Sequence, residues 1–534
     1  MKKKFLVAAV SVLICGGLLF VGCQRKTAAA DAGEAATFTL LVDVGSGRPY
    51  ADGWFGLYDV IAKEIGVQIQ IIGYPYQAAL EQKNILLNTG NYPDAMGGWI
   101  VVDNDIMTLS SDGTIIPLEN YIANTTNIKE ALAQPGVRQN MTLPDGHIYS
   151  PPYIVEEPLV SFSPWINQAW LDQLGLKMPT TTGEFRQTLI AFRDRIPAVN
   201  GQKIIPFSGD PNNLHLGTLA GWFGVNASGA ANNAGYFAVI NGQVESTIIR
   251  PEYREFLKYF AGLYKEGLVD QELFTQNVDT WKAKGKQGLY GSSIAYQPGD
   301  FLPDIEPKDK ESNPSKNWYG WTPIPVLKAP GVANPIFRNN NNGITLFRTQ
   351  FVITDKAQSK AQRIVDWLDR VYDPIHSTEC DLGPLGKTWN LMALTDGIQY
   401  FQTIDTSSWN QDDRDRNGWS GYSVAELPKY RRPKTQWKEQ PRPGWENEYK
   451  DTDVRDALYK PFLEATPMPA LWLTEANAKR AADLQTAITD YVKQKQAEWV
   501  SGQADIDREW DTYVAQLNRL GLQELLQIKR SAVR

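Results

Sequence analysis

The stretch that decides the fold is residues 37–72, TFTLLVDVGSGRPYADGWFGLYDVIAKEIGVQIQII. Its first part, Thr37 to Val44, is rich in β-branched and apolar residues and ends in the turn-forming residues 45–49, so it predicts a strand followed by a loop. Apolar residues then recur at helical spacing from Trp54 to Ile65, and residues 67–72 predict a second strand. This order is typical of a β-α-β unit with parallel strands.

The same alternation continues along the chain. A helix is expected over 77–87, closed by Gly90, and a third strand over 95–102. Thr181 and Glu184 form a capping-box pattern that opens a helix to about Arg195. Further expected elements are a helix over 251–267, a strand over 351–354, helices over 361–372, 475–499 and 508–520, and a long irregular segment over 396–460. Alternating strands and helices predict an α/β protein.

The N-terminus has the pattern of an export signal. Three lysines, Lys2 to Lys4, precede an apolar run from Phe5 to Phe20. This run is shorter than a typical transmembrane helix. Gly22 and Cys23 follow, and this ending resembles a bacterial lipoprotein signal, which implies that residues 1–22 are removed and that Cys23 carries the lipid. Residues 23–36 then form a flexible tether. The alternative is an ordinary secretory signal cut near residues 28–30.

Composition narrows the classes of function. The chain has 534 residues with a formal net charge of −7, and cleavage after Gly22 removes three lysines and no acids, which leaves −10. An acidic chain is not expected to bind nucleic acid, or anionic lipid through its protein surface. With Cys23 acylated, only Cys380 remains in the mature chain, so an intramolecular disulfide is excluded. The length predicts two or more lobes.

Several segments resemble the extracellular solute-binding proteins of ABC-type sugar importers, family 1, in its lipoprotein branch. The segments with this resemblance are Leu87 to Asp94, Asp112 to Leu118, Asp145 to Pro152, Asn167 to Thr181, Asp490 to Val492 and Glu509 to Val514. The resemblance covers most of the mature chain. It implies a two-lobed periplasmic-binding-protein-like fold, with a hinge, a ligand cleft between the lobes and closure by hinge motion. We expect one lobe over 37–157 and 345–455, and the other over 158–344 and 460–534.

The resemblance also implies a function. We expect a monomeric binding protein, lipid-anchored on the extracytoplasmic face of the cell membrane, which delivers a carbohydrate, an oligosaccharide above all, to an ABC permease. It would use no cofactor and no metal and would not be an enzyme. Two alternatives stay open: an extracellular glycosidase, whose two carboxylates leave no spacing in sequence, and a binding subunit that feeds a membrane sensor.

A sugar site needs flat apolar surfaces for the faces of the rings and fixed polar partners for the hydroxyl groups. Because ligands of open α/β sheets bind beyond the carboxyl ends of strands, such residues are expected at strand ends and in irregular segments. The predicted ligand-binding residues are Asp43, Arg48, Trp99, Trp222, Tyr296, Arg338 and Trp389. Trp170, Trp367, Trp499 and Trp510 lie on helical faces and are expected in the core.

Each candidate also has a structural interpretation. The four aromatic residues are more often packing residues than ligand platforms. Arg48 is equally suited to capping its loop, and Arg338 with residues 339–343 favours a turn. If Arg48 and Arg338 both faced the ligand, an acidic sugar would be plausible.

Three motif matches fail on their chemistry. Ile204 and Ile205 stand where a calcium loop over 194–205 would need acids. Residues 413–418 match the first half of an EF-hand loop, but Val424 takes the place of its bidentate glutamate. Residues 383–388 have glycines too close together for a phosphate loop, and they predict a turn.

Overall fold

The computed structural model describes residues 36–44, 55–156, 160, 162–209, 216–228, 235–303, 320–338, 344–423, 425–442, 450–469 and 471–533. Residues 36–534 form one compact unit. The candidate lipidation site Cys23, the candidate Arg48 and the run 339–343 lie outside the described residues.

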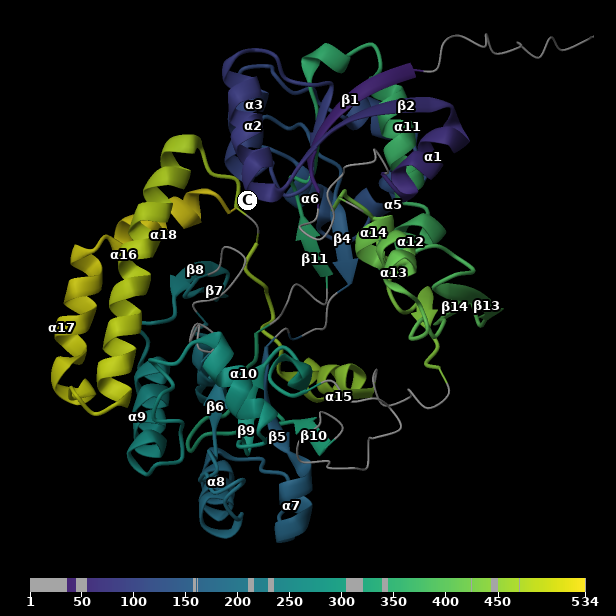
Figure 1. The fold of residues 1–534 in the computed structure, drawn as a ribbon. Helices are drawn as coiled ribbons and strands as arrows, with labels where there is room; N and C mark the ends of the chain where they lie inside the picture. Colours follow the sequence, from purple (N-terminus) through teal and green to yellow (C-terminus); the bar gives the residue numbers. More distant parts are fainter. Residues whose placement is uncertain are drawn as a thin grey trace, which may run out of the picture. The chain divides into compact units, whose positions relative to one another are not determined.

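The first sheet has the order β12-β3-β1-β2. β1 (Ala36–Asp43) pairs in parallel with β2 (Val67–Tyr74) and with β3 (Ala95–Gly97), and β12 (Phe351–Ile353) runs antiparallel to β3. Alternate residues of β1 serve two cores: Leu40 packs with α1 (Leu57–Ile65), whereas Leu41 packs with α2 (Tyr76–Asn88). Helices therefore cover both faces of this sheet, as Figure 1 shows for α1 and α11 on one side and α2 and α3 on the other.

The second sheet has the order β10-β5-β9-β6. Its strands are β10 (Trp321–Pro323), β5 (Ser163–Asn167), β9 (Ser292–Ala295) and β6 (Ser208–Gly209). β5 pairs antiparallel with β9 and β10, and β6 pairs parallel with β9.

The other strands in the described part of the chain form three smaller sheets. β4 (Tyr153–Glu156) and β11 (Ile344–Phe347) form an antiparallel pair, as do β7 (Phe237–Ile240) and β8 (Gln243–Ser246). The third contains β13 (Trp389–Thr395), β14 (Ile398–Thr403) and β15 (Trp437–Glu439).

The other α-helices are α3 (Asp103–Ser111), α4 (Glu119–Ile122), α5 (Asn127–Leu132), α6 (Val137–Met141), α7 (Gln168–Leu174), α8 (Thr182–Arg195), α9 (Pro251–Lys265), α10 (Val278–Lys286), α11 (Ala361–Val371), α12 (Pro374–Leu382), α13 (Gln411–Asn417), α14 (Trp419–Tyr422), α15 (Lys450–Tyr459), α16 (Glu475–Val500), α17 (Ile506–Arg519) and α18 (Leu522–Ser531). Short 3-10 helices span Leu216–Phe223, Pro298–Asp300, Asp355–Ala357 and Lys460–Phe462.

The sequence-based elements are largely confirmed. The β-α-β unit over 37–72 forms with parallel strands, and the Thr181–Glu184 capping box opens α8 as predicted. Two expectations were wrong. The third strand ends at Gly97, not at 102, and the segment 396–460 contains two strands and three helices. Residues 450–455, which we assigned to the first lobe, belong to α15, and this helix contacts β10 of the second sheet.

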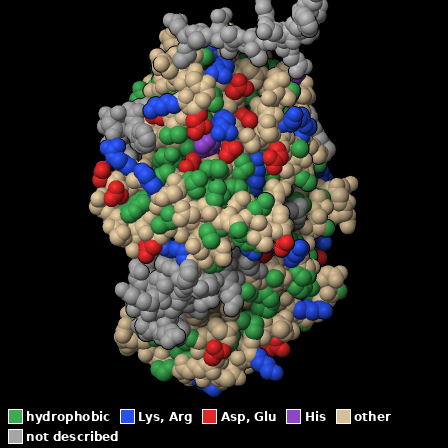
Figure 2. All heavy atoms as spheres, turned by 90° about the vertical axis from the view of Figure 1, so that its right-hand side faces the viewer, with side chains coloured by type: hydrophobic (Ala, Val, Ile, Leu, Met, Phe, Trp, Pro, Cys, Tyr) green, Lys and Arg blue, Asp and Glu red, His purple; other side chains and the backbone are tan. Residues whose placement is uncertain are grey.

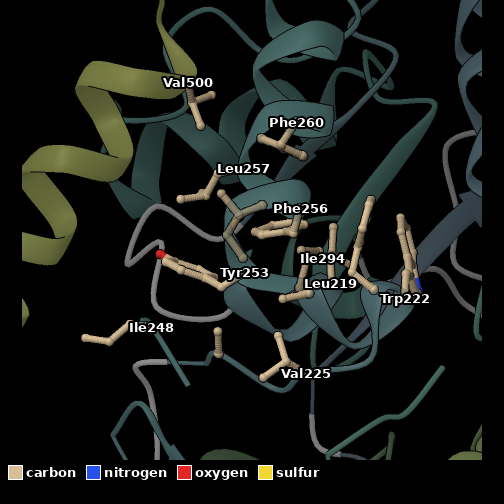
Figure 3. Packing of buried hydrophobic residues seen from close by; sticks show 14 of the residues in the cluster. Leu219, Trp222, Val225, Ile248, Tyr253, Phe256, Leu257, Phe260, Ile294 and Val500 are labelled. Atoms are coloured by element: carbon tan, nitrogen blue, oxygen red, sulfur yellow. The ribbon is translucent and has the colours of Figure 1, made fainter. Parts of the chain in front are cut away.

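The two largest hydrophobic cores follow the two large sheets. One joins residues of 38–154 and 351–430, and the other joins residues of 160–337 and 459–526. Figure 3 shows part of the second, where Tyr253, Phe256 and Phe260 of α9 pack toward Leu219 and Ile294. Trp170, Trp367, Trp499 and Trp510 are buried, which confirms them as core residues. Cys380 is buried as well, and burial raises the pKa of its thiol to about 12.

The surface has mixed character. On the face drawn in Figure 2, acidic and basic side chains are intermixed, and hydrophobic side chains gather in patches between them. Within the part of the chain that the structure describes, we find no helix with the length and apolar character that crossing a membrane requires.

His376 on α12 joins a buried charged cluster in the first core. Its Nδ1 lies 2.9 Å from Glu379 Oε2, and its Nε2 lies 3.5 Å from Glu64 Oε2. Burial lowers the pKa of His376, but the carboxylates of Glu379, Glu64 and Asp373 outweigh it, so its pKa is raised above 6.5. The protonated imidazole is therefore stabilised in the folded protein.

This cluster predicts a pH-dependent stability. A raised folded pKa means that the contribution of His376 is fully present below about pH 6.5 and is lost as the pH rises through the folded pKa. In His376→Gln we expect that component of the pH dependence to disappear, measured by urea unfolding between pH 5 and 9. His147→Gln is the control, because its half-exposed side chain contacts Glu119 in water. Identical pH profiles for wild type and His376→Gln would contradict the assignment.

Candidate ligand-binding site

Asp43 and Trp99 meet at the carboxyl ends of two neighbouring parallel strands. Asp43 is the last residue of β1, and Trp99 follows β3 by two residues. The backbone N–H of Trp99 donates to Asp43 Oδ1 at 2.7 Å. Gly98 makes this approach possible, because it has a φ of +82° and a Cβ at this position would collide with the Asp43 carboxylate. The structure thus brings two of the predicted ligand-binding residues together at strand ends, as expected from the sheet.

The Trp99 side chain belongs to an aromatic cluster whose other members are the buried Tyr153, 5% exposed, and the half-buried Phe347. Its ring is T-shaped against Phe347 of β11, with centroids 5.0 Å apart, and lies 6.4 Å from the ring of Tyr153 of β4. Tyr153 and Phe347 are 5.2 Å apart. Trp99 keeps 36% of its surface exposed, a large fraction for this residue type. We call Trp99, Tyr153 and Phe347 the aromatic platform.

Charged side chains border the aromatic platform. The Tyr153 hydroxyl donates to Glu426 Oε2 at 2.9 Å. Lys429, with 2% of its side chain exposed, lies 2.6 Å from Asp381 and 3.7 Å from Glu426, and its ammonium is 5.3 Å from the centroid of the Tyr153 ring. The segment that carries Lys429 is fixed by backbone hydrogen bonds to both sides of Ile154 in β4.

The pKa values show how strongly these groups interact. Burial would lower the pKa of Lys429, but Asp381, Tyr153 and Glu426 raise it well above its usual value, so the ammonium stays charged. Burial raises the pKa of Asp43, and nearby Glu426 adds to the rise, while the Trp99 N–H opposes it. Burial also raises the pKa of Tyr153, which remains a neutral hydrogen-bond donor.

Tyr296 lies in a second aromatic group, at the end of β9. Its backbone N–H donates to Asp300 Oδ2 at 3.0 Å, and its ring is T-shaped against Phe162, with centroids 6.0 Å apart. The guanidinium of Arg455 lies 5.5 Å from the Tyr296 ring centroid and 5.6 Å from that of Trp165. Tyr296 is half-buried, in a position that suits either packing or a ligand.

The structure places two of the predicted aromatic residues in the core and not at a surface. Trp222 lies in the 3-10 helix Leu216–Phe223, is 1% exposed and packs edge-on against Phe185. Trp389 is fully buried and donates its indole N–H to the carbonyl of Gly383. Neither ring presents a face to a ligand in this structure, because neighbouring elements cover both.

Arg338 is half-buried at the segment that pairs with residues 462–464. The backbone N–H of Glu464 donates to the carbonyl of Phe337 at 2.9 Å. Burial lowers the pKa of Arg338, and Glu464 opposes this shift. Glu464 of the same chain is therefore a charged neighbour of Arg338.

Sequence reasoning missed Tyr153, Phe347, Glu426 and Lys429. β4 and β11 are four residues long and come from opposite ends of the 153–347 interval, so no local periodicity marks their pairing. The nearest signal was the segment Asp145 to Pro152, which resembles the family and directly precedes Tyr153.

The two segments with partial calcium motifs have other structures. Val199 and Gln202 are bridged around a tight turn at Asn200 and Gly201, and residues 411–417 form helix α13. Among the residues described, no group of three or more His, Cys, Asp or Glu side chains is arranged to hold a metal ion.

Comparison with known proteins gives matches over nearly the whole chain, although no family model matches it. The fructooligosaccharide ABC transporter substrate-binding protein FusA of Streptococcus pneumoniae is 29% identical over 484 residues, covering 88% of this chain and 85% of that protein. Lipoprotein LipO of Bacillus subtilis is 24% identical over 403 residues, covering 73% of this chain and 74% of LipO.

Solved structures agree in fold. The structure of FusA in complex with kestose superposes with a TM-score of 0.69 at 25% identity, covering 93% of this chain and 98% of FusA. An HMO-binding, ABC-transporter-associated solute-binding protein from Bifidobacterium longum infantis gives a TM-score of 0.74 at 21% identity, with coverage of 93% and 98%. The predicted two-lobed α/β fold of periplasmic binding proteins is thereby confirmed. In sequence and in fold, the chain is therefore similar to substrate-binding proteins of ABC transporters.

Proposed function

We propose that this protein captures an oligosaccharide outside the cytoplasm and delivers it to an ABC importer. The relatives support this function, because FusA is named for fructooligosaccharides and the Bifidobacterium protein for HMO binding. Both are binding proteins and not enzymes.

The observation that carries the proposal is the aromatic platform. A sugar ring offers a face of C–H groups, and burying about 40 Å² of it against an aromatic ring contributes about 1 kcal/mol. Trp99 leaves such a ring exposed beside the carboxylates of Asp43 and Glu426, which can accept hydrogen bonds from sugar hydroxyls. Flat apolar surface beside fixed acceptors is the combination that a sugar requires.

We assign the second half of the site to Tyr296 and to Arg338 on the crossing segment. In this proposal the lobes comprise 37–157 with 345–449, and 158–344 with 450–534, and the ligand touches both. A ligand that contacts both lobes stabilises only the closed state, so it shifts the population toward closure. Arg48 remains a candidate contact on the loop after β1.

We also propose that Cys23 carries the lipid that holds the protein at the membrane. The relative LipO is a lipoprotein by name. A palmitate-containing modification at Cys23 would place the sugar site on a tether of residues 24–36, next to the permease.

Trp99→Ala should weaken oligosaccharide binding at least about tenfold, or ~1.4 kcal/mol, with little loss of stability. The backbone N–H that holds Asp43 remains in this variant, and the ring is already one-third exposed. Isothermal titration of the chain from Gln24 with kestose, nystose and other neutral oligosaccharides measures the effect, and chromatography checks that the sugar is recovered intact. This form contains the whole compact unit.

Two further variants calibrate that experiment. Trp409→Ala removes another partly buried tryptophan, outside the aromatic platform, and should leave affinity unchanged. Trp222→Ala should instead lower the free energy of unfolding by about 3–5 kcal/mol, because it opens a cavity in the core. Equal affinity of Trp99→Ala and wild type would refute the platform, and cleaved sugar would favour a glycosidase.

Cys23→Ala should abolish lipid attachment. Cells fed radiolabelled palmitate should label the wild-type protein and not the variant, and only the wild type should partition into the detergent phase of Triton X-114. Cys380→Ala is the matched control, because this buried thiol should accept no lipid. Label retained in Cys23→Ala would rule out the proposed anchor.

A further inference from the structure

Two carboxylates lie beside the aromatic platform, Asp43 with 7% of its surface exposed and Glu426 with 31% of its side chain exposed. Asp43 is tied to the backbone of Trp99, and Glu426 is tied to the hydroxyl of Tyr153, while the rings of Trp99 and Tyr153 lie 6.4 Å apart. A sugar stacked on Trp99 therefore meets acidic oxygens at the edges of the same surface.

The described cations beside the aromatic platform, Lys429 and Arg431, both form ion pairs with Asp381. The Lys429 ammonium is buried at 2% exposure and is engaged by Asp381 at 2.6 Å, whereas the Glu426 side chain keeps 31% of its surface exposed. Arg431, among the described residues, also binds Asp381, at 3.1 Å. Asp381 engages both cations, at 2.6 Å and 3.1 Å, whereas Glu426 lies 3.7 Å from Lys429 and remains partly exposed.

The arginines of the second aromatic group also have partners within the chain. Arg455 is 2% exposed, beneath the rings of Tyr296 and Trp165, and its guanidinium donates to the Tyr296 carbonyl. Arg338 has Glu464 as its charged neighbour. A bidentate grip on a ligand carboxylate needs an exposed guanidinium fork, which Arg455 does not offer.

We propose that Glu426 and Asp43 make this site selective for neutral oligosaccharides over oligosaccharides built from uronic acids. The inference rests on the proposed function and adds the class of sugar. Hydroxyl groups donate to the two carboxylates, so a neutral sugar satisfies them. A uronate brings a like charge to the same edge, and such juxtaposition at a desolvated contact costs far more than a missing hydrogen bond.

Lys429, buried beside Tyr153, helps to fix the position of the Glu426 carboxylate. Lys429 holds Glu426 and the face of Tyr153 from the buried side, so the carboxylate cannot swing into the interior to avoid a charged ligand. The Tyr153 hydroxyl holds the same carboxylate through its donated hydrogen bond. Charge and position are thus fixed before a ligand arrives.

The test compares each neutral tetrasaccharide with its own oxidised form. Nystose, maltotetraose, cellotetraose and lacto-N-tetraose are titrated into the chain from Gln24, and so are the same sugars after oxidation of their primary alcohols to carboxylates. The skeleton is then matched, and each oxidation replaces one hydroxyl donor with a carboxylate, so the variant and the salt series below are needed to separate charge from the lost donor. We expect that at least one neutral sugar binds and that its oxidised form binds at least about tenfold more weakly at low salt.

Glu426→Gln identifies the origin of the difference. Glutamine keeps an acceptor for the Tyr153 hydroxyl and removes the charge, so the ratio between neutral and oxidised sugar should shrink at least about threefold. Glu255→Gln, an exposed acid on α9, is the control and should leave the ratio unchanged. If Glu426→Gln fails to fold, raising salt from 0.05 to 1 M should shrink the wild-type ratio in the same direction.

The outcomes separate the two proposals. Equal or tighter binding of the oxidised sugar overturns the selectivity and leaves the oligosaccharide-binding function standing. A preference for neutral sugar that neither Glu426→Gln nor salt reduces also overturns the assigned cause. If neutral and oxidised sugars all fail to bind, the proposed function falls and the inference falls with it.

Discussion

The backbone hydrogen bonds of β4 are the constraint on which the candidate site depends. On one side this strand pairs with β11, and on the other the N–H and carbonyl of Ile154 bond to residues 429 and 431. Three segments that lie far apart in the sequence are therefore fixed within one ladder. Tyr153 lies in β4, Phe347 in its partner β11, and Glu426 three residues before Lys429, whose carbonyl accepts from Ile154. Trp99 joins this group from the end of β3.

Electrostatics reinforces this arrangement. A lysine buried as deeply as Lys429 costs several kcal/mol in lost hydration unless carboxylates surround it. Asp381 and Glu426 supply that compensation, and Glu426 can do so only while its segment stays beside β4. The buried ion pair thus contributes more to the position of Glu426 than to net stability, since such pairs roughly balance their own desolvation.

How much of the structure could be predicted from the sequence depends on how far apart in the chain the interacting residues lie. Capping and periodicity act within one element, so the Thr181 capping box and the α9 face were predictable. The strand-end rule placed Asp43 and Trp99 correctly beside each other, because parallel neighbours share an edge. It failed to separate them from Trp222 and Trp389, whose exposure depends on what distant elements cover. β4 and β11 were beyond reach, because four-residue strands carry almost no periodic signal.

The burial of Cys380 has a practical consequence for spectroscopy. Its thiol is inaccessible and holds its proton, so it does not react readily with maleimides near neutral pH. A chain that starts at Gln24 has no other cysteine. Any single cysteine introduced at an exposed position can therefore be labelled selectively without first removing the native one. A fluorophore placed near Trp99 would turn the protein into a reagentless reporter of its own ligand.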